Sequence, residues 1–317
     1  MQFPPDSYPI GTPGQPWGAP EIDQWRARQR RQRSYAQDVL APLARERAGL
    51  VRRQYGEIVY GDERYPVHAL HSSDWRVGRP GVLVTGGVHG YETSGVLGAL
   101  AFADAYAQRY QGRVNLLVVP CVSPWGWERV QRWNYDAIDP NRSFHAHSPA
   151  QESRALQALV ARYAGQFAAH VDLHETTDSD EAEFRPALAA RDGKPFVPGR
   201  VPDGFYSVDD TEASEPAFQR AIVDAVARVT HIAPADERGE IIGSAVVAPG
   251  VIRYRLREWG LCASVSGARY RCTTEVYPDS ARTTPAECTA AQVAAVCAAL
   301  DHVLAAGGDQ GRGSAVL

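Results

Sequence analysis

Residues 81–92 read Gly-Val-Leu-Val-Thr-Gly-Gly-Val-His-Gly-Tyr-Glu, and this stretch decides the fold. Its first half is a short run of apolar and β-branched residues, which is typical of a buried strand. Its second half contains His89 and Glu92, and a helical pattern runs from Glu92 to Tyr110. A strand that leads through glycines into a helix places polar groups at its carboxyl end, where the chemistry of α/β proteins gathers.

The rest of the chain repeats this alternation. Further β-rich stretches lie at residues 67–71, 114–119 and 168–173, and helical segments separate most of them. Two segments, 148–151 and 284–287, combine a hydroxyl N-cap, a proline in the first turn and a capping-box residue; the second begins a helix that ends near Gly307. The alternation predicts an α/β fold with a mixed, mainly parallel central sheet and helices on both faces.

Three regions are expected along the chain. Residues 1–50 form an N-terminal arm and helix: the first 20 contain six prolines, and the helix-rich remainder should be kinked or divided at Pro42. Residues 51–310 form the main domain. Within it, residues 178–250 are the least patterned and are interpreted as an insertion at the rim of a site, with a helix from about Ser214 to Thr230.

Composition limits the classes of partner and the compartment. The net charge of −4 leaves no basic surplus for a nucleic acid. Five cysteines without a CxxC spacing fit reduced thiols. The N-terminus lacks the apolar core of a signal peptide, and no apolar run approaches the roughly 18 residues that span a membrane. We therefore predict a cytoplasmic protein that binds neither nucleic acid nor membrane.

A metal site is predicted from histidine and carboxylate spacing. His89 and Glu92 follow the buried strand, and a three-residue offset at a strand-to-helix turn can direct both side chains at one point. The spacing alone is weak evidence, because His71 and Asp74 share it. A catalytic zinc needs a third ligand and an open position for water. His174 ends the strand FAAHVDLH and is the best third ligand; the alternative is that it only packs and makes hydrogen bonds.

Between these ligands the sequence contains a Pro-x-Gly loop with an arginine, residues 124–132, and then Asp-x-Asn-Arg, residues 139–142. This order of motifs, followed by a strand-end histidine and a late strand-borne glutamate, resembles the zinc carboxypeptidase family, including its succinylglutamate desuccinylase and aspartoacylase branch. The resemblance spans residues 81–278 and implies one Zn²⁺ per chain.

The resemblance also implies roles for four residues around the metal. Asn141 and Arg142 bind the free carboxylate of the substrate, a task suited to the fork of arginine. Arg132 polarises the scissile carbonyl and stabilises the oxyanion that forms when water attacks. Asp139 orients the first histidine ligand.

Glu275 is the expected general base. It lies in the β-rich segment Arg-Cys-Thr-Thr-Glu-Val-Tyr-Pro, residues 271–278, and a buried glutamate is costly unless it has a function. Beside a zinc-bound water it can accept a proton and deliver it to the leaving amine, as the equivalent glutamate of the family does. The alternative is a structural salt bridge with Arg271 or Arg253. The family's substrate-covering tyrosine is left open, since residues 254 and 270 are both candidates.

Three functions remain open at this point. The leading one is a metallocarboxypeptidase-like hydrolase that cleaves an amide bond next to a free carboxylate in a peptide. The second keeps the zinc chemistry but acts on N-acyl amino acids. The third is a non-catalytic zinc-binding module, against which Glu275 argues, because a structural zinc site closes with four ligands and needs no base.

Overall fold

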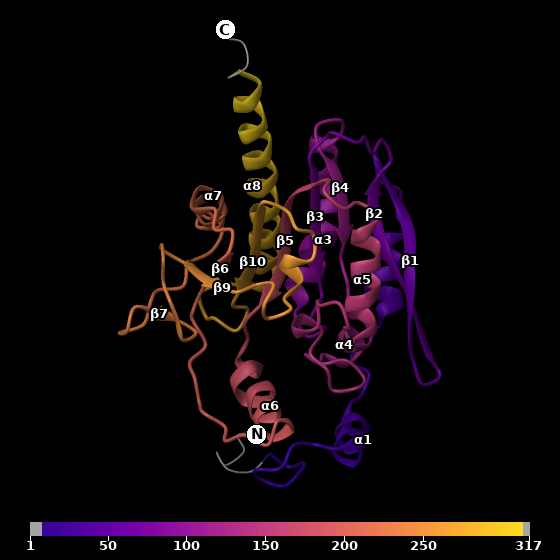
Figure 1. Cartoon of the computed structure of the whole chain (residues 1–317), viewed down its shortest axis with the longest axis vertical. Helices are drawn as coiled ribbons and strands as arrows, with labels where there is room; N and C mark the ends of the chain where they lie inside the picture. The colour runs from indigo at the N-terminus through magenta and orange to yellow at the C-terminus, as the bar shows by residue number, and fades with distance from the viewer. Residues whose placement is uncertain (1–7, 313–317) are drawn as a thin grey trace.

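The centre of the computed structural model, which describes residues 8–312, is a twisted eight-stranded sheet (Figure 1). Its strand order is β1-β2-β4-β3-β5-β10-β6-β9. The strands are β1 (Leu50–Tyr60), β2 (Glu63–Ser72), β3 (Gly81–Gly86), β4 (Asn115–Val119), β5 (Phe167–Glu175), β6 (Tyr206–Asp210), β9 (Val251–Tyr254) and β10 (Tyr270–Val276); β7 (Glu240–Ile241) and β8 (Ser244–Ala245) form a separate hairpin.

The sheet is mixed, with a parallel centre. Strand β3 pairs in parallel with both β4 and β5, β5 pairs in parallel with β10, and β6 with β9. The pairs β1–β2, β2–β4 and β10–β6 are antiparallel. Because β3, β5 and β10 are parallel neighbours, their carboxyl ends meet at one edge of the sheet.

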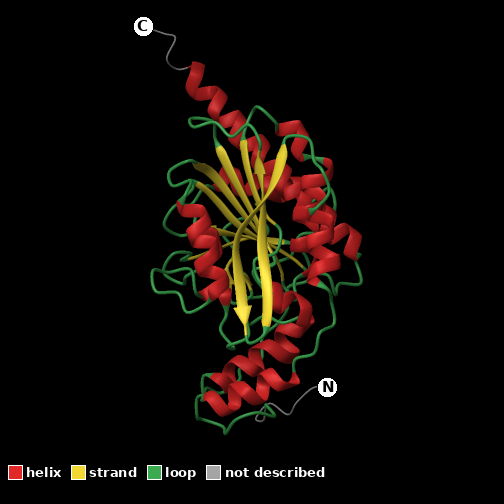
Figure 2. Cartoon of the chain, turned by 90° about the vertical axis from the view of Figure 1, so that its right-hand side faces the viewer, coloured by secondary structure: helices red, strands yellow, loops and turns green. Residues whose placement is uncertain are grey.

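Helices cover both faces of the sheet, as Figure 2 shows. Helices α3 and α7 each contact α8, whereas α5 packs against β1 with a different set of buried apolar side chains. The helices and helical turns are α1 (Ala19–Arg28), η1 (Ala36–Leu40), α2 (Ala41–Leu43), α3 (Thr93–Ala105), η2 (Ala107–Tyr110), α4 (Pro124–Arg129), η3 (Pro140–Arg142), α5 (Gln151–Ala161), η4 (Asp180–Phe184), α6 (Arg185–Arg191), α7 (Pro216–Val226), η5 (Cys262–Ser264) and α8 (Pro285–Arg312). The predicted fold class is confirmed.

Two regions differ from the sequence-based expectation. The helical segment after residue 20 is interrupted at residues 29–35, ahead of Pro42, and the sheet begins at Leu50 with a strand that was not predicted. Residues 178–250 are more than a rim insertion, because they supply β6 to the central sheet and α7 to the layer beside α8. Residues 1–7 of the proline-rich arm lie outside the described residues.

One helix of the described chain is long and apolar enough to cross a membrane by length and composition, namely Pro285–Gly307 within α8. This corrects the expectation that no apolar segment reaches that length. Half of the apolar segment is buried inside the molecule, and α8 contacts both α3 and α7. Its apolar composition is therefore matched by a place in the core.

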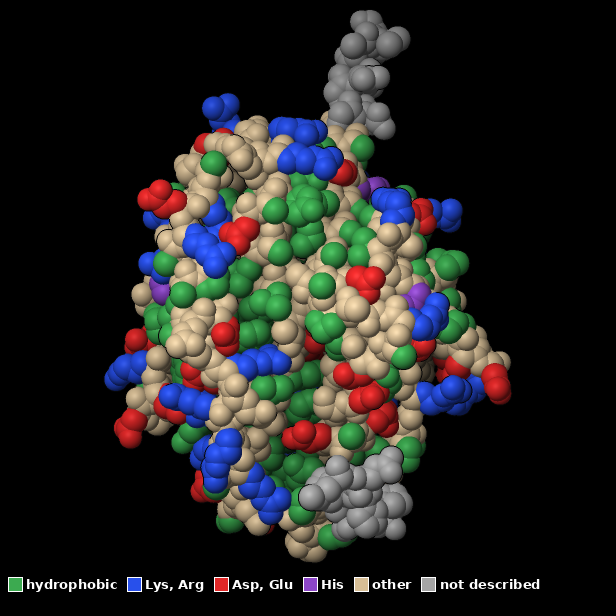
Figure 3. Space-filling model, turned by 180° about the vertical axis from the view of Figure 1, so that it is seen from behind, with side chains coloured by type: hydrophobic (Ala, Val, Ile, Leu, Met, Phe, Trp, Pro, Cys, Tyr) green, Lys and Arg blue, Asp and Glu red, His purple; other side chains and the backbone are tan. Residues whose placement is uncertain are grey.

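Charged side chains are intermixed on the face of the molecule shown in Figure 3. Neither acidic nor basic side chains gather into one continuous patch on that face. This distribution agrees with the small net charge of the sequence.

Candidate functional site

Three segments that are distant in sequence meet at the carboxyl edge of the sheet. His89 follows β3, and Glu92 is the N-cap of α3. His174 lies near the end of β5, where it pairs in register with Glu275 of β10. The parallel arrangement of β3, β5 and β10 therefore brings the three predicted metal ligands and the predicted base to one edge.

A close backbone approach fixes the loop that carries His89. The N–H of Gly90 donates to the carbonyl oxygen of Gln131 over 3.0 Å. A Cβ atom on Gly90 would lie 1.9 Å from the carbonyl carbon of Gly126, so no side chain fits at this position. The glycine in His-Gly-Tyr-Glu thus allows the ligand loop to pack directly against α4, which leads into the segment carrying Arg132.

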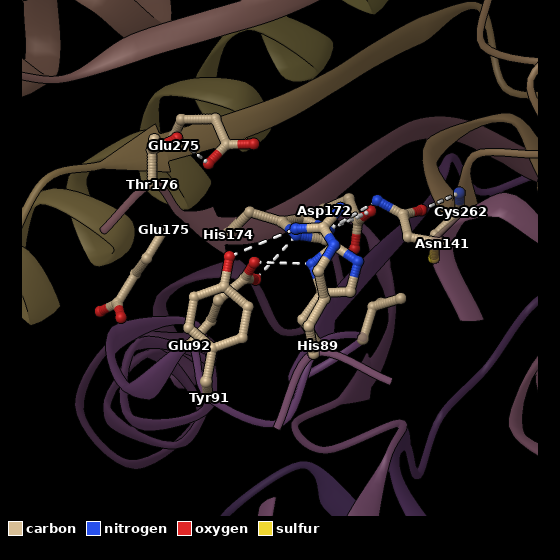
Figure 4. A network of polar contacts seen from close by, with 12 residues as sticks. His89, Tyr91, Glu92, Asn141, Asp172, His174, Glu175, Thr176, Cys262 and Glu275 are labelled. Atoms are coloured by element: carbon tan, nitrogen blue, oxygen red, sulfur yellow. Dashed lines mark hydrogen bonds and ion pairs between the residues drawn. The ribbon is translucent and has the colours of Figure 1, made fainter. Parts of the chain in front are cut away.

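His89, Glu92 and His174 face one another in the interior (Figure 4). The Nδ1 atom of His89 lies 2.6 Å from Oε1 of Glu92, and Nδ1 of His174 lies 2.7 Å from Oε2 of the same carboxylate. Their exposed fractions are 2%, 1% and 1%. Each residue offers one ligand atom, and these atoms lie within 4.8 Å of one another. The group is thus close enough to hold one metal ion.

The far nitrogens of both histidines are bound to carboxylates. The Nε2 atom of His89 lies 3.0 Å from Oδ1 of Asp139, and Nε2 of His174 lies 2.8 Å from Oδ2 of Asp172. Such carboxylates hold an imidazole ring so that its other nitrogen is presented to a metal. Both Nδ1 atoms accordingly face Glu92. Asp139 thus lies where an orienting carboxylate would be needed, whereas Asp172 was not anticipated from the sequence.

The chemistry of this donor set fits Zn²⁺. Glu92 Oε2 is buried and has no hydrogen-bond partner among the described residues, because its approach to His174 lacks hydrogen-bond geometry. Burial alone would raise the pKa of Glu92, but His174 and His89 hold it at about 2, so the carboxylate is ionised. Two imidazole nitrogens and one ionised carboxylate are an established ligand set for catalytic zinc.

Glu275 lines a cavity of about 680 Å³ that also reaches His89 and Glu92. The hydroxyl of Thr176 donates to its Oε2 over 2.9 Å. Burial raises the pKa of Glu275 to about 8, and the nearby charge of Glu92 adds to this while His174 opposes it. The alternative salt bridges are absent from the described residues: Arg271 pairs with Asp210 at 2.9 Å and Arg253 with Asp209 at 3.3 Å.

Arg132 also lines the cavity and is held on two sides. Its Nε donates to Asp139 Oδ2 over 3.0 Å, and one terminal nitrogen donates to the hydroxyl of Tyr91 over 3.3 Å. Burial would lower its pKa, but Asp139, Tyr91 and Asp180 raise it well above the usual value, so the guanidinium is charged. The preceding loop contains a left-handed Val130 (φ 55°), an uncommon conformation for a β-branched residue.

Asn141 and Arg142 both line the cavity but differ in burial and in hydrogen-bond partners. Asn141 is buried, and its Oδ1 accepts a hydrogen bond from the backbone N–H of Cys262 over 2.7 Å, while its Nδ2 lies 3.4 Å from His174 Nε2. Arg142 is exposed and lines the cavity, and its guanidinium donates to the carbonyl oxygen of Asn141 over 2.8 Å. Among residues 8–307, whose side chains are described, no carboxylate forms an ion pair with Arg142.

Two tyrosines lie beside Glu275. Tyr206 is its neighbour across the β10–β6 pair, with its hydroxyl 2.8 Å from that of Thr176, and Tyr254 also lines the cavity. Tyr270 packs instead against Phe218 and His302. Geometry therefore favours Tyr254 over Tyr270, and it adds Tyr206, which no pattern in the sequence indicated.

The N-terminal arm closes one wall of the cavity together with α6. The N–H of Trp17 donates to the carbonyl oxygen of Arg191 over 2.8 Å, and Pro16 forms a β-bridge with Asp192. Trp17 also packs edge-on against Trp133, with ring centroids 6.1 Å apart. Trp17, Ile22 and Leu188 all line the cavity. Nothing in the first 20 residues of the sequence predicted this position.

In a comparison with known families, residues 81–181 match the family described as "Protein of unknown function (DUF2817)". Carboxypeptidase 2 of Trichophyton rubrum is 30% identical over 146 residues, which cover 43% of this chain and 27% of that protein. Carboxypeptidase 2 of Trichophyton tonsurans is 31% identical over 125 residues, 36% of this chain and 23% of that protein. The matches thus span about a quarter of the length of these curated relatives.

Solved structures share the fold over most of the chain. A protein from Shewanella denitrificans, named only as a candidate metallopeptidase, superposes with a TM-score of 0.62 at 19% identity and covers 85% of this chain and 89% of its own. A metallo-carboxypeptidase from Burkholderia cenocepacia gives 0.57 at 15% identity, with coverage of 91% and 69%. A succinylglutamate desuccinylase from a Silicibacter species gives 0.52 at 13% identity, with coverage of 83% and 68%. These likenesses confirm the resemblance seen in the sequence, and the chain has the fold of zinc carboxypeptidase-like proteins.

Proposed function

We propose that this protein is a zinc-dependent hydrolase of the carboxypeptidase type, which cleaves an amide bond next to a free carboxylate. One observation carries the proposal: a single cavity is lined by metal-ligand candidates, the half-buried carboxylate of Glu275 and the arginines Arg132 and Arg142. The cavity-lining members are His89, Glu92, Glu275, Arg132 and Arg142, and His174 completes the ligand group.

In this proposal His89, Glu92 and His174 hold the zinc. When bound, Zn²⁺ supplies a Lewis acid and lowers the pKa of its water. Glu275 accepts the proton of the attacking water and then donates it to the leaving amine. Desolvation raises the pKa of Glu275 from its usual acidic range toward neutral pH, which supports a group that both accepts and returns a proton.

Arg132 stabilises the oxyanion that develops on the scissile carbonyl. Its guanidinium is fixed by Asp139 and Tyr91 before substrate arrives, and preorganised charge of this kind needs no rearrangement during the reaction. Asp139 also contacts Nε2 of His89, so one carboxylate orients both a candidate metal ligand and the guanidinium of Arg132.

Arg142 is the main anchor for the substrate carboxylate. Its charge is not paired with a carboxylate of the described side chains, and a guanidinium can bind a carboxylate through two parallel hydrogen bonds. The amide oxygen of Asn141 is already bound by Cys262 N–H, so Asn141 contributes to this anchor mainly through the backbone carbonyl that holds Arg142.

The cavity favours a short substrate. The arm and α6 close one wall, which restricts the length of chain that can lie across the metal ligands. Beside Glu275, the β6–β10 pair presents Val208 and Thr273 to the cavity, and Leu261 joins them. This enclosure supports a second candidate reaction, deacylation of N-acyl amino acids, alongside cleavage of short peptides.

Parallel assays test the proposal and separate its two versions. The purified chain, loaded with zinc, is given dipeptides and N-acyl amino acids, each with a free or an amidated carboxylate. We expect hydrolysis of free-carboxylate substrates only. Faster turnover of N-acyl amino acids than of dipeptides would favour the deacylase version. Zinc held by a fourth protein ligand, with no hydrolysis of any substrate, would favour the binding module instead.

The role of Glu275 is tested by Glu275→Gln, with Glu258→Gln, an exposed position, as the matched control. Loss of a general base lowers the rate by about 10²–10⁴-fold. We expect this loss in Glu275→Gln with zinc stoichiometry unchanged, and full activity in the control. Full activity of a zinc-loaded Glu275→Gln would show that the mechanism is wrong.

A further inference from the structure

A second buried polar cluster lies behind His174. His170, Asp172 and His174 alternate along β5, so their side chains share one face of the sheet. Thr85 of β3 is the register partner of Asp172. The exposed fractions of Thr85, His170 and Asp172 are all 0%, so every polar atom of this cluster depends on a protein partner.

The contacts of the cluster form a continuous series that ends at the metal-ligand candidate. The Oγ1 atom of Thr85 lies 2.9 Å from Nε2 of His170 and 2.5 Å from Oδ1 of Asp172. The second oxygen of Asp172 lies 2.8 Å from Nε2 of His174. At the other end, Nδ1 of His170 lies 3.1 Å from the carbonyl oxygen of Ala263.

This cluster is not a second metal site, although His170, Asp172 and Cys262 lie close enough to hold an ion. Both nitrogens of His170 and both oxygens of Asp172 already have partners. Burial raises the pKa of the Cys262 thiol well above its usual value, so the thiolate that a metal needs is disfavoured. The cluster is therefore a set of hydrogen bonds.

The available protons assign a donor to each hydrogen bond of the cluster. The hydroxyl of Thr85 has a single proton, and the shorter contact, 2.5 Å, places it toward the carboxylate of Asp172. The carbonyl oxygen of Ala263 can only accept, so the neutral ring of His170 carries its proton on Nδ1 and donates it to Ala263, which leaves Nε2 as an acceptor beside the Thr85 hydroxyl. The oxygen of Thr85 accepts from the thiol of Cys262 over 3.6 Å. Asp172 accepts the Nε2 proton of His174 with its other oxygen, which leaves the lone pair on Nδ1 of His174.

We propose that Thr85 is a positioning residue for the metal site: through Asp172 it holds His174 with Nδ1 directed at the ion. The inference rests on the proposed zinc site. Without the hydroxyl of Thr85, one oxygen of Asp172 loses its donor in a buried setting, and the carboxylate that orients His174 loses its fixed geometry.

The test is a pair of substitutions at one position, measured as zinc affinity. Thr85→Val keeps the shape and removes the hydroxyl, whereas Thr85→Ser keeps the hydroxyl. Loss of a group that orients a metal ligand lowers affinity by about 10–100-fold. We expect Thr85→Val to weaken zinc binding by about tenfold in competition with a chromogenic chelator, and Thr85→Ser to bind like wild type. Thr230→Val, whose hydroxyl donates to Thr283, is the matched control.

Equal zinc affinity of Thr85→Val and wild type would overturn the inference. A wild-type chain that binds zinc but cleaves no substrate would refute the proposed function while leaving this comparison decisive. A wild-type chain that binds no zinc would overturn both.

A second measurement uses the wild-type chain alone, so it does not depend on whether a variant folds. In long-range ¹H–¹⁵N spectra of the zinc-loaded wild-type chain, His174 is expected to carry its proton on Nε2 and His170 on Nδ1. A His174 protonated on Nδ1 instead would leave Oδ2 of Asp172 without its donor and overturn the inference.

Discussion

His170 makes the stability of the metal-free protein sensitive to acid. Burial lowers its pKa from 6.5 to about 4, and the positive charge of Arg271 on β10 acts in the same direction, as does His174. Asp172 on the same strand and the carbonyl of Ala263 oppose this lowering. The ring is fully buried, so solvent screens none of these effects.

The loss of stability follows from the difference between the pKa of His170 in the folded state and its pKa in the unfolded state. The unfolded chain binds a proton at this ring near pH 6.5, but the folded chain does so only near pH 4. Stability is therefore unaffected above pH 6.5 and is lost as the pH falls from 6.5 to 4. A difference of about 2.5 pH units, at about 1.4 kcal/mol per unit, corresponds to roughly 3 kcal/mol.

The assay is urea unfolding of the chelator-treated chain between pH 4 and pH 8, with His170→Gln as the test and His147→Gln, an exposed histidine, as the control. At pH 8 we expect His170→Gln to be less stable than wild type by about 1–2 kcal/mol, because it loses hydrogen bonds. This deficit should vanish or reverse by pH 4, whereas the control should follow wild type. Parallel pH profiles for wild type and His170→Gln would refute the reasoning.

Three further predictions concern the cavity and its loops. Arg142→Ala should lower kcat/KM for free-carboxylate substrates by about 10–100-fold, since a hydrogen bond to a charged group contributes about 1.5–3 kcal/mol, and should leave any slow cleavage of amidated substrates unchanged; an equal loss for both would exclude the anchor role. Gly90→Ala should destabilise the chain by about 3 kcal/mol or more in urea unfolding, because the new Cβ meets the backbone of Gly126, whereas Gly112→Ala, where a Cβ meets nothing, should cost only the strain of its positive φ. Trp17→Ala should raise KM for the longest accepted substrates more than for acetylated amino acids; a uniform change in KM would show that Trp17 does not contact substrate.

The centre of the sheet could be predicted because its strands are apolar and buried on both faces. Every residue of β3 is buried, so the sequence shows an uninterrupted apolar run. Strand β1 lies at the edge of the sheet, and its exposed and buried positions alternate irregularly. It also has a bulge between Gln54 and Gly56, so the sequence shows no regular alternation that would predict a strand. Strand β6 is fully buried yet ends in Asp209 and Asp210, whose charges are paired with arginines of other strands.

The sequence could predict those residues of the site whose location follows from their position along the chain. Strand ends and the order of motifs indicated the three ligand candidates and Glu275, which the structure brings together. Asp172 could have been found, because a residue two positions before His174 shares its face of the strand. Thr85 could not, since its contact depends on the register between β3 and β5. The commitment of the Asn141 amide to Cys262, 121 positions away, is likewise invisible in the sequence.

The packing of the N-terminal segment against the loop that leads to Arg132 has a consequence for the order in which the chain folds. Trp25 packs against Trp125 and Trp133, with ring centroids 5.9 and 5.6 Å apart, so the arm finds its partners only among residues about a hundred positions later. Contacts of such large sequence separation form late, because the loop between them must close first. Although this segment precedes the sheet in the sequence, it is thus among the last to pack, and the wall of the cavity is completed only after the rest of the domain has folded.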